Sequence, residues 1–198
     1  MKKELTLRQK QHNATLEAIR SSVDKMVEEI GFEKMTIRDI CAESGITVGT
    51  FYNYFSSKND LLKDRFIRTS EHFNSLYESE LEKMDEIEAL KEFSREYMEF
   101  CNRRAYKIFR IYYQVKMEEY ENWKKTMPDG IRTCVEQLVS KGQTNGSITN
   151  KYPQKSITTM LMSLLHGVTV EYLTDDRTVL ADVTIEKMIS EYIDSLRN

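Results

Sequence analysis

The stretch that decides the fold is residues 36–58, which read TIRDICAESGITVGTFYNYFSSK. Thr36 and the aspartate three residues later have the spacing of a capping box, which predicts a short helix that stops at Gly45. Thr47 opens a second short helix, and the small side chains at Ala42 and Gly45 are expected to let the two helices cross closely. Two short helices joined by a tight turn predict a helix-turn-helix.

The second helix of this pair has an unusual outer face. Phe51 and Phe55 lie one turn apart and are expected to anchor the helix to the core. The residues left for the outer face are Thr47, Val48, Gly49, Thr50, Tyr52, Asn53 and Tyr54. None of them is acidic, and hydroxyl and amide groups can bind phosphates or base edges. Lys58 adds a cation at the start of the next helix. The pattern predicts a helix that enters the major groove of DNA.

Long helical patterns surround this unit, and they predict an all-α fold of about nine helices. The first pattern runs from about Thr6 to Ile30, and another opens at Ser57 and reaches about Met84. Further helices are expected over roughly 154–174 and 182–196, after an Asn-Gly loop near residue 146. Only 7 glycines and 2 prolines occur in 198 residues, which favours few turns and argues against an all-β fold.

Charge and cysteine usage narrow the function classes. Residues 1–70 hold 12 Lys and Arg against 10 Asp and Glu, whereas residues 71–198 hold 17 against 22, so a nucleic-acid contact is expected near the front. The three cysteines are scattered, which favours a reducing, cytoplasmic compartment. The sequence contains no run of 18 apolar residues, so no membrane span is predicted. The three histidines lie far apart without catalytic spacing, so neither an enzyme nor a cofactor or metal site is expected.

The stretch from Ile19 to Leu62 resembles the TetR family of transcriptional repressors. The matching parts are Gly31-Phe32, Thr36-Ile37-x-x-Ile40, Ala42, Ser44-Gly45-Ile46, Gly49-Thr50-Phe51-Tyr52-x-Tyr54-Phe55 and Ser57-Lys58-x-x-Leu61. The resemblance implies an all-helical homodimer. Its N-terminal three-helix domain, residues 1–56, would bind a palindromic operator. Its C-terminal domain, residues 57–198, would dimerise and hold a small-molecule ligand that releases DNA.

Carried over residue by residue, the resemblance assigns roles on DNA. Thr36 and Lys58 would bind phosphate, residues 47–50 would approach base edges, and residues 52–54 would face phosphates or bases. Val48 departs from the pattern, because this position is often polar or basic in the family; here it would contact a thymine methyl group. The first helix also lacks a basic residue just before Ile19. The charge would then come from upstream residues acting as an arm: Lys2, Lys3, Arg8 and Lys10.

The middle helices are rich in aromatic and methionine side chains. Such side chains suit an adaptable pocket for a mostly apolar or aromatic ligand, although each could equally belong to a core. The candidate ligand-binding residues are Tyr97, Cys101, Phe109, Tyr112, Tyr113, Met117, Trp123, Met127, Met162 and His166.

The last two helices carry apolar stripes that predict a dimer interface of four helices. The stripe residues are Ile157, Leu161, Leu164, Val168, Ile185, Met188, Ile189 and Tyr192. The sequence thus predicts a ligand-responsive DNA-binding repressor that pairs with a second copy of itself. The alternative is a helical dimeric interaction module whose main partner is a protein, with DNA binding secondary.

Overall fold

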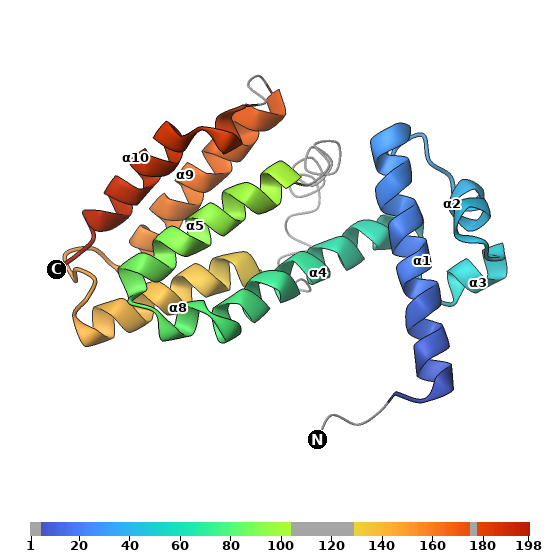
Figure 1. Cartoon of the computed structure of the whole chain (residues 1–198), viewed down its shortest axis with the longest axis horizontal. Coiled ribbons are helices and arrows are strands. Elements are labelled where there is room, and N and C mark those ends of the chain that lie inside the picture. Colours follow the sequence, from blue (N-terminus) through green and yellow to red (C-terminus); the bar gives the residue numbers. More distant parts are fainter. Residues whose placement is uncertain (1–4, 104–128, 175–177) are drawn as a thin grey trace.

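The computed structural model describes residues 5–103, 129–174 and 178–198, and within these ranges every regular element is a helix (Figure 1). The α-helices are α1 (Leu7–Glu29), α2 (Ile37–Ser44), α3 (Val48–Tyr52), α4 (Lys58–Ser79), α5 (Glu86–Arg103), α8 (Gly130–Asn145), α9 (Gln154–Thr174) and α10 (Val183–Asp194). Two 3₁₀-helices, η1 (Leu81–Lys83) and η2 (Val179–Ala181), join them. The predicted all-α class is confirmed.

A small head is formed by α1, α2, α3 and the first turn of α4. It encloses its own apolar core, which includes Ile19, Ile40 and Phe51, each fully buried. Gly45 ends α2 with a φ of 66°, a left-handed conformation that glycine adopts without strain. The predicted close crossing at Ala42 and Gly45 is wrong, because both residues are exposed and a Cβ on Gly45 would meet nothing within 4 Å.

Helix α4 runs from the head into the body, which comprises α5, α8, α9, α10 and the second half of α4 (Figure 1). Leu61 and Leu62 belong to the head core, whereas Phe73 belongs to the core of the body. The helix ends at Ser79, five residues before the predicted end at Met84, because the chain leaves helical geometry at Glu80 and tightens into η1. One rigid element therefore contributes to both cores.

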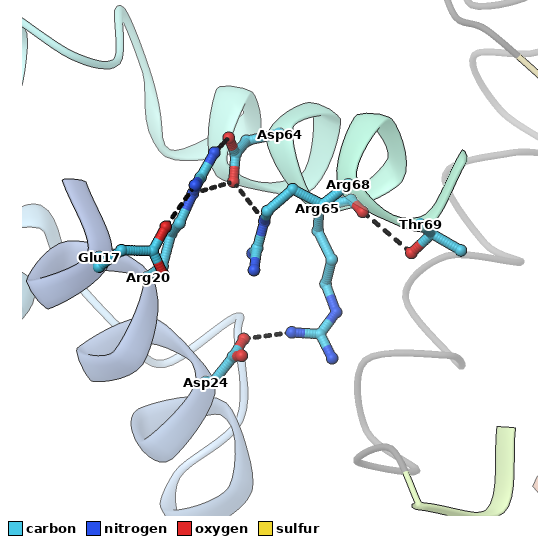
Figure 2. A network of polar contacts seen from close by, with 7 residues as sticks. All are labelled: Glu17, Arg20, Asp24, Asp64, Arg65, Arg68 and Thr69. Atoms are coloured by element: carbon cyan, nitrogen blue, oxygen red, sulfur yellow. Dashed lines mark hydrogen bonds and ion pairs between the residues drawn. The ribbon is translucent and has the colours of Figure 1, made fainter. Parts of the chain in front are cut away.

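A network of charged side chains fastens α1 to the middle of α4 (Figure 2). The guanidinium of Arg20 donates to both carboxylate oxygens of Asp64, at 3.0 and 2.5 Å. Arg68 donates to the same carboxylate at 2.9 Å, and Arg65 pairs with Asp24 one turn further along α1. A bidentate contact between a guanidinium and a carboxylate fixes the relative orientation of the two groups as well as their distance. The Arg20–Asp64 pair therefore holds the head in a defined position on α4.

The body buries a larger apolar core between α5, α8, α9 and α10. Helix α8 approaches α4 so closely at Gly130 that a Cβ there would lie 2.4 Å from the carbonyl oxygen of Ser70. The backbone N–H of Gly130 donates to the buried Ser70 hydroxyl at 3.1 Å. Both α9 and α10 start and end within two residues of the predicted limits.

Candidate nucleic-acid interface

Helix α3 is short, and its two ends are fixed by different forces. The Thr47 hydroxyl accepts the backbone N–H of Thr50 at 3.0 Å, which caps the start of the helix. Phe51 is fully buried and Phe55 is 6% exposed, so the inner face is anchored in the head core as predicted. The outer face of α3 is thereby held in one orientation.

The outward residues of α3 form a surface that is free of carboxylates. Val48 is 40% exposed and Tyr52 is 54% exposed. Thr47, Gly49 and Asn53 are also exposed, and Thr50 is partly so. A Cβ on Gly49 would find only the Thr47 hydroxyl, at an ordinary 3.8 Å, so the fold itself does not require glycine there. The seven predicted DNA-contacting residues of this segment thus lie on α3 or next to it. All of them except Tyr54 are accessible to a partner on the outer face of α3.

Thr36 lies exposed at the start of α2, where the predicted capping box is present. Its hydroxyl donates to the Asp39 carboxylate at 2.6 Å, and the Asp39 backbone N–H returns to that hydroxyl at 3.2 Å. The Thr36 backbone N–H also donates to this carboxylate, at 3.0 Å, and the two hydrogen bonds that the carboxylate accepts lower the pKa of Asp39. The capping box defines where α2 begins and therefore where Thr36 is presented.

Tyr54 differs from its neighbours because it turns toward α1. Its ring stacks on His12 with centroids 4.7 Å apart, and its hydroxyl donates to the His12 carbonyl at 3.4 Å. The ring is half-buried against the head core. Sequence reasoning did not select His12, although it lies four residues before Leu16 on the stripe that continues into the core.

Lys58 is engaged with the protein itself. Its Nζ donates to the carbonyl oxygens of Phe32, Glu33 and Met35 at 3.1, 3.3 and 3.2 Å. It also lies 4.7 Å from the centre of the Phe32 ring. The Lys58 amine therefore links the start of α4 to the connector between α1 and α2. This structural role was not part of the prediction, which assigned Lys58 to a DNA phosphate.

Four of the predicted ligand-binding residues lie on α5 and α9 of the body: Tyr97, Cys101, Met162 and His166. The Tyr97 and His166 rings lie 6.2 Å apart between α5 and α9, and the Cys101 sulfur lies 3.9 Å from the Thr169 hydroxyl. Burial raises the pKa of Cys101 to about 12, so this thiol is not a reactive thiolate at neutral pH.

The other predicted ligand-binding residues lie outside the described residues. They are Phe109, Tyr112, Tyr113, Met117, Trp123 and Met127. Lys2 and Lys3 of the predicted arm lie outside as well, whereas Arg8 and Lys10 belong to the first turns of α1 rather than to an arm.

The structure corrects part of the predicted dimer interface. Ile157, Leu161 and Ile189 are 2%, 0% and 5% exposed, because they face the core of their own chain and cannot reach a partner. The remaining stripe residues are exposed or half-buried: Leu164, Val168, Ile185, Met188 and Tyr192. Helix α9 carries apolar side chains on its outward side as well, among them Met160, so its periodicity alone did not distinguish the inner face from the outer one.

The outward face of α9 includes residues that the sequence reading missed. Met160 is 50% exposed and Val170 is 42% exposed, although both are apolar. Met160 and Tyr192 also border an open groove of about 530 Å³ between the start of α9 and the end of α10. With the half-buried Leu164 and Val168, these exposed apolar side chains make the outward side of α9 a candidate contact surface.

Residues 5–103, 129–174 and 178–198 show no sign of a metal centre or a membrane span. They contain no group of three side chains that could hold a metal ion. They also contain no helix long and apolar enough to cross a membrane.

Comparisons with known proteins agree with this geometry. The family model described as "Bacterial regulatory proteins, tetR family" matches residues 24–64, which span the end of α1 through the start of α4. An uncharacterized HTH-type transcriptional regulator, YvdT of Bacillus subtilis (strain 168), is 42% identical over 53 residues. That alignment covers 27% of this chain and 27% of YvdT.

Solved structures share the fold over nearly the whole chain. FadR from Bacillus subtilis in complex with stearoyl-CoA has a TM-score of 0.75 at 16% identity, covering 92% of this chain and 100% of that one. GusR of Salmonella enterica has a TM-score of 0.72 at 18% identity, covering 98% and 99%. A TetR transcription regulator from Haloarcula marismortui has a TM-score of 0.71 at 18% identity, covering 94% and 100%. Residues 24–64 are thus similar to the helix-turn-helix part of TetR-family transcriptional regulators, and the chain shares its overall fold with solved members of that family.

Proposed function

We propose that this protein is a ligand-responsive repressor that binds a palindromic operator as a homodimer. The observation that carries the proposal is the outer face of α3, where hydroxyl, amide and small side chains are exposed and carboxylates are absent. Such a face can approach phosphates without repulsion and can bind base edges in the major groove. Thr36 at the start of α2 would add a phosphate contact.

Gly49 gives this proposal a sharp test. Gly49→Ala should leave the fold intact and slightly favour α3, since alanine is the better helix former. On DNA, the added methyl group would separate the helix from the base edges, so affinity should fall about tenfold or more. Tyr52→Phe removes only a hydroxyl and should weaken binding about fivefold, the value of one hydrogen bond. Tyr152→Phe, which changes an equally exposed tyrosine of the body, is the matched control.

The measurement begins with a pool of random-sequence DNA duplexes enriched on the immobilised 198-residue chain. Affinities for the most enriched duplex are then compared by fluorescence anisotropy, with thermal unfolding run in parallel. Normal affinity of both α3 variants would contradict the assignment of this face. Failure to enrich any duplex would favour the alternative of a protein-interaction module.

We propose that the dimer forms through the outward stripes of α9 and α10. Met188 is 61% exposed, and Ile185 and Tyr192 lie one turn to either side of it. Met188→Glu would place a charge in this apolar contact and should shift the sedimentation of the protein to that of a monomer. Val183→Glu is the control, because Val183 is 76% exposed on the opposite side of α10. A dimer that persists in Met188→Glu would rule out this interface.

The ligand is proposed to be a small, mostly apolar or aromatic molecule held in the body. Support comes from the aromatic and sulfur-containing side chains that α5 and α9 bring together around Tyr97 and His166. The solved relative FadR holds stearoyl-CoA, so this compound belongs in a test panel of apolar and aromatic molecules. An inducer must lower affinity for the enriched duplex, and the duplex must lower affinity for the inducer by the same factor. A broad panel without such coupling would contradict ligand control.

A further inference from the structure

The first half of α1 extends beyond the apolar core of the head and touches the head through the stack of His12 on Tyr54. Residues 7–14 are all exposed, and the apolar contacts of α1 begin only at Leu16 and continue through Ile19 to Val27. Leu7 is 73% exposed. In Figure 1 this end of α1 projects past α3 toward the N-terminus. Apolar burial therefore does not explain why the chain continues as a helix here.

The projecting half is nevertheless built to start as a helix. The Thr6 hydroxyl accepts the Gln9 backbone N–H at 3.3 Å, and the Gln9 side chain accepts the Thr6 backbone N–H at 2.9 Å. This reciprocal capping box satisfies two N–H groups that would otherwise lack partners. The helix is thus defined from its first turn, although it has no core beneath it.

Its charges run against the helix dipole. Residues 5–16 contain Arg8 and Lys10 and no acidic residue, whereas residues 17–29 contain four acidic and two basic residues. Cations near a helix N-terminus and carboxylates near its C-terminus are both unfavourable to the helix. Charges placed unfavourably relative to the helix dipole point to an interaction with a partner that compensates for them. Because the charges at this end are positive, the partner would have to be an anion.

His12 connects this basic half to the DNA-facing surface. It stacks on Tyr54, two residues after the end of α3, and the Tyr54 hydroxyl reaches its carbonyl oxygen. Through Tyr54, the basic half of α1 is therefore joined to the chain directly after the outer-face residues Tyr52 and Asn53. Continuity and charge both identify the anion as the same DNA that α3 would bind.

We propose that the first half of α1 is a second DNA-contacting surface, in which Arg8 and Lys10 bind phosphates flanking the bases approached by α3. His12, held by its stack on Tyr54, donates a hydrogen bond to the backbone at the junction. This assignment rests on the proposed function. It also supplies the positive charge that α3 lacks, because Lys58 is engaged with carbonyl groups of the head.

The test compares salt dependence on the enriched duplex. Arg8→Gln/Lys10→Gln should weaken binding about tenfold or more and lower the slope of log K against log salt by about two units, one for each lost phosphate contact. Lys25→Gln is the control on the packed half of α1, where Lys25 pairs with Glu43 at 2.6 Å, and its slope should not change. His12→Phe keeps the stack and removes the donor, so it should weaken binding about fivefold.

The outcomes separate this inference from the proposed function. If the double variant binds with the wild-type slope and affinity while Gly49→Ala is weakened, the α1 surface is overturned and the α3 face stands. If the slope falls as expected and circular dichroism is unchanged, the α1 surface is supported. If the wild-type chain binds none of the duplexes, the proposed function itself fails.

Discussion

The head and the body enclose their cores in different ways. Among the described residues, the head core contains 12 buried apolar side chains and the body core contains 26. The smaller core of the head is supplemented by polar contacts at its edges. Arg20 and Arg65 bind carboxylates across the α1–α4 crossing, and Lys58 donates to carbonyl groups of the connector before α2. The body has the larger apolar core, and it encloses five of the six buried polar side chains of the described residues, among them Glu86 and Thr158.

This difference suits the two tasks. A small domain buries too little apolar surface to be rigid by packing alone, so its orientation depends on directional contacts. The ion pairs of Figure 2 bind the head to α4 at a place where neither core reaches fully. A displacement of α4 by the body would therefore be passed to α1 through Asp64 and Arg65. Single substitutions in the head and in the body measure how much apolar packing and polar contacts contribute to the stability of each region.

The largest effect is expected in the apolar core of the body. Leu161 is fully buried there, so Leu161→Glu would enclose an unpaired carboxylate and should lower the free energy of unfolding by several kcal/mol. Its neighbour Met160 is 50% exposed, so Met160→Glu places no charge in the core and should lower the melting temperature far less than Leu161→Glu. Circular dichroism melts compare the two. Equal stability of both variants would mean that Leu161 faces outward.

The buried carboxylate of the body predicts a dependence on pH. Burial raises the pKa of Glu86, but hydrogen bonds from Asn145, Ser147 and Lys141 outweigh it and bring the pKa to about 2, from an ordinary 4.5. A lowered pKa in the folded state means stability that is present above pH 4.5 and lost as the pH falls toward 2. The amount is about 3 kcal/mol. Denaturant unfolding between these pH values should show this loss.

Glu86→Gln supplies the control, because it removes the titrating group. The variant should be less stable at pH 7 and should lose less stability on acidification than the wild type. Parallel pH profiles for the two proteins would show that Glu86 is not the group responsible.

Lys58 tests whether the polar ties of the head are structural. Lys58→Met keeps the aliphatic stem and removes the amine that three carbonyl oxygens accept, so the variant should be less stable by about 1–2 kcal/mol. The salt slope of DNA binding should stay close to that of the wild type. Unchanged stability with a slope reduced by about one unit would instead assign the amine to a phosphate, as the family resemblance implies.

The contrast between the regions also explains what could be predicted from sequence. Capping boxes and anchoring phenylalanines are local patterns, so α2, α3 and the exposed face of α3 were predicted correctly. Lys58 was not, because its partners lie 23 to 26 residues away and its carbonyl contacts leave no pattern in the sequence. Helix α9 misled for a different reason. It carries apolar side chains on both its buried and its exposed side, so Leu161 and Met160 could be distinguished only by what packs against them.

The smallest effect is expected at a single hydroxyl in the body. Thr158 and Thr169 are both fully buried on α9, yet the Thr158 hydroxyl has no hydrogen-bond partner, whereas Thr169 donates to the Leu165 carbonyl at 2.9 Å. Valine has nearly the same shape as threonine, so Thr158→Val removes an unsatisfied polar group and should raise the free energy of unfolding by about 1 kcal/mol. Thr169→Val removes a satisfied hydroxyl and should leave stability unchanged or lower it by up to about 1 kcal/mol. Urea unfolding of both variants measures the difference directly. If Thr158→Val proves the less stable of the two, the body satisfies this hydroxyl after all, and its core is less purely apolar than the contrast with the head requires.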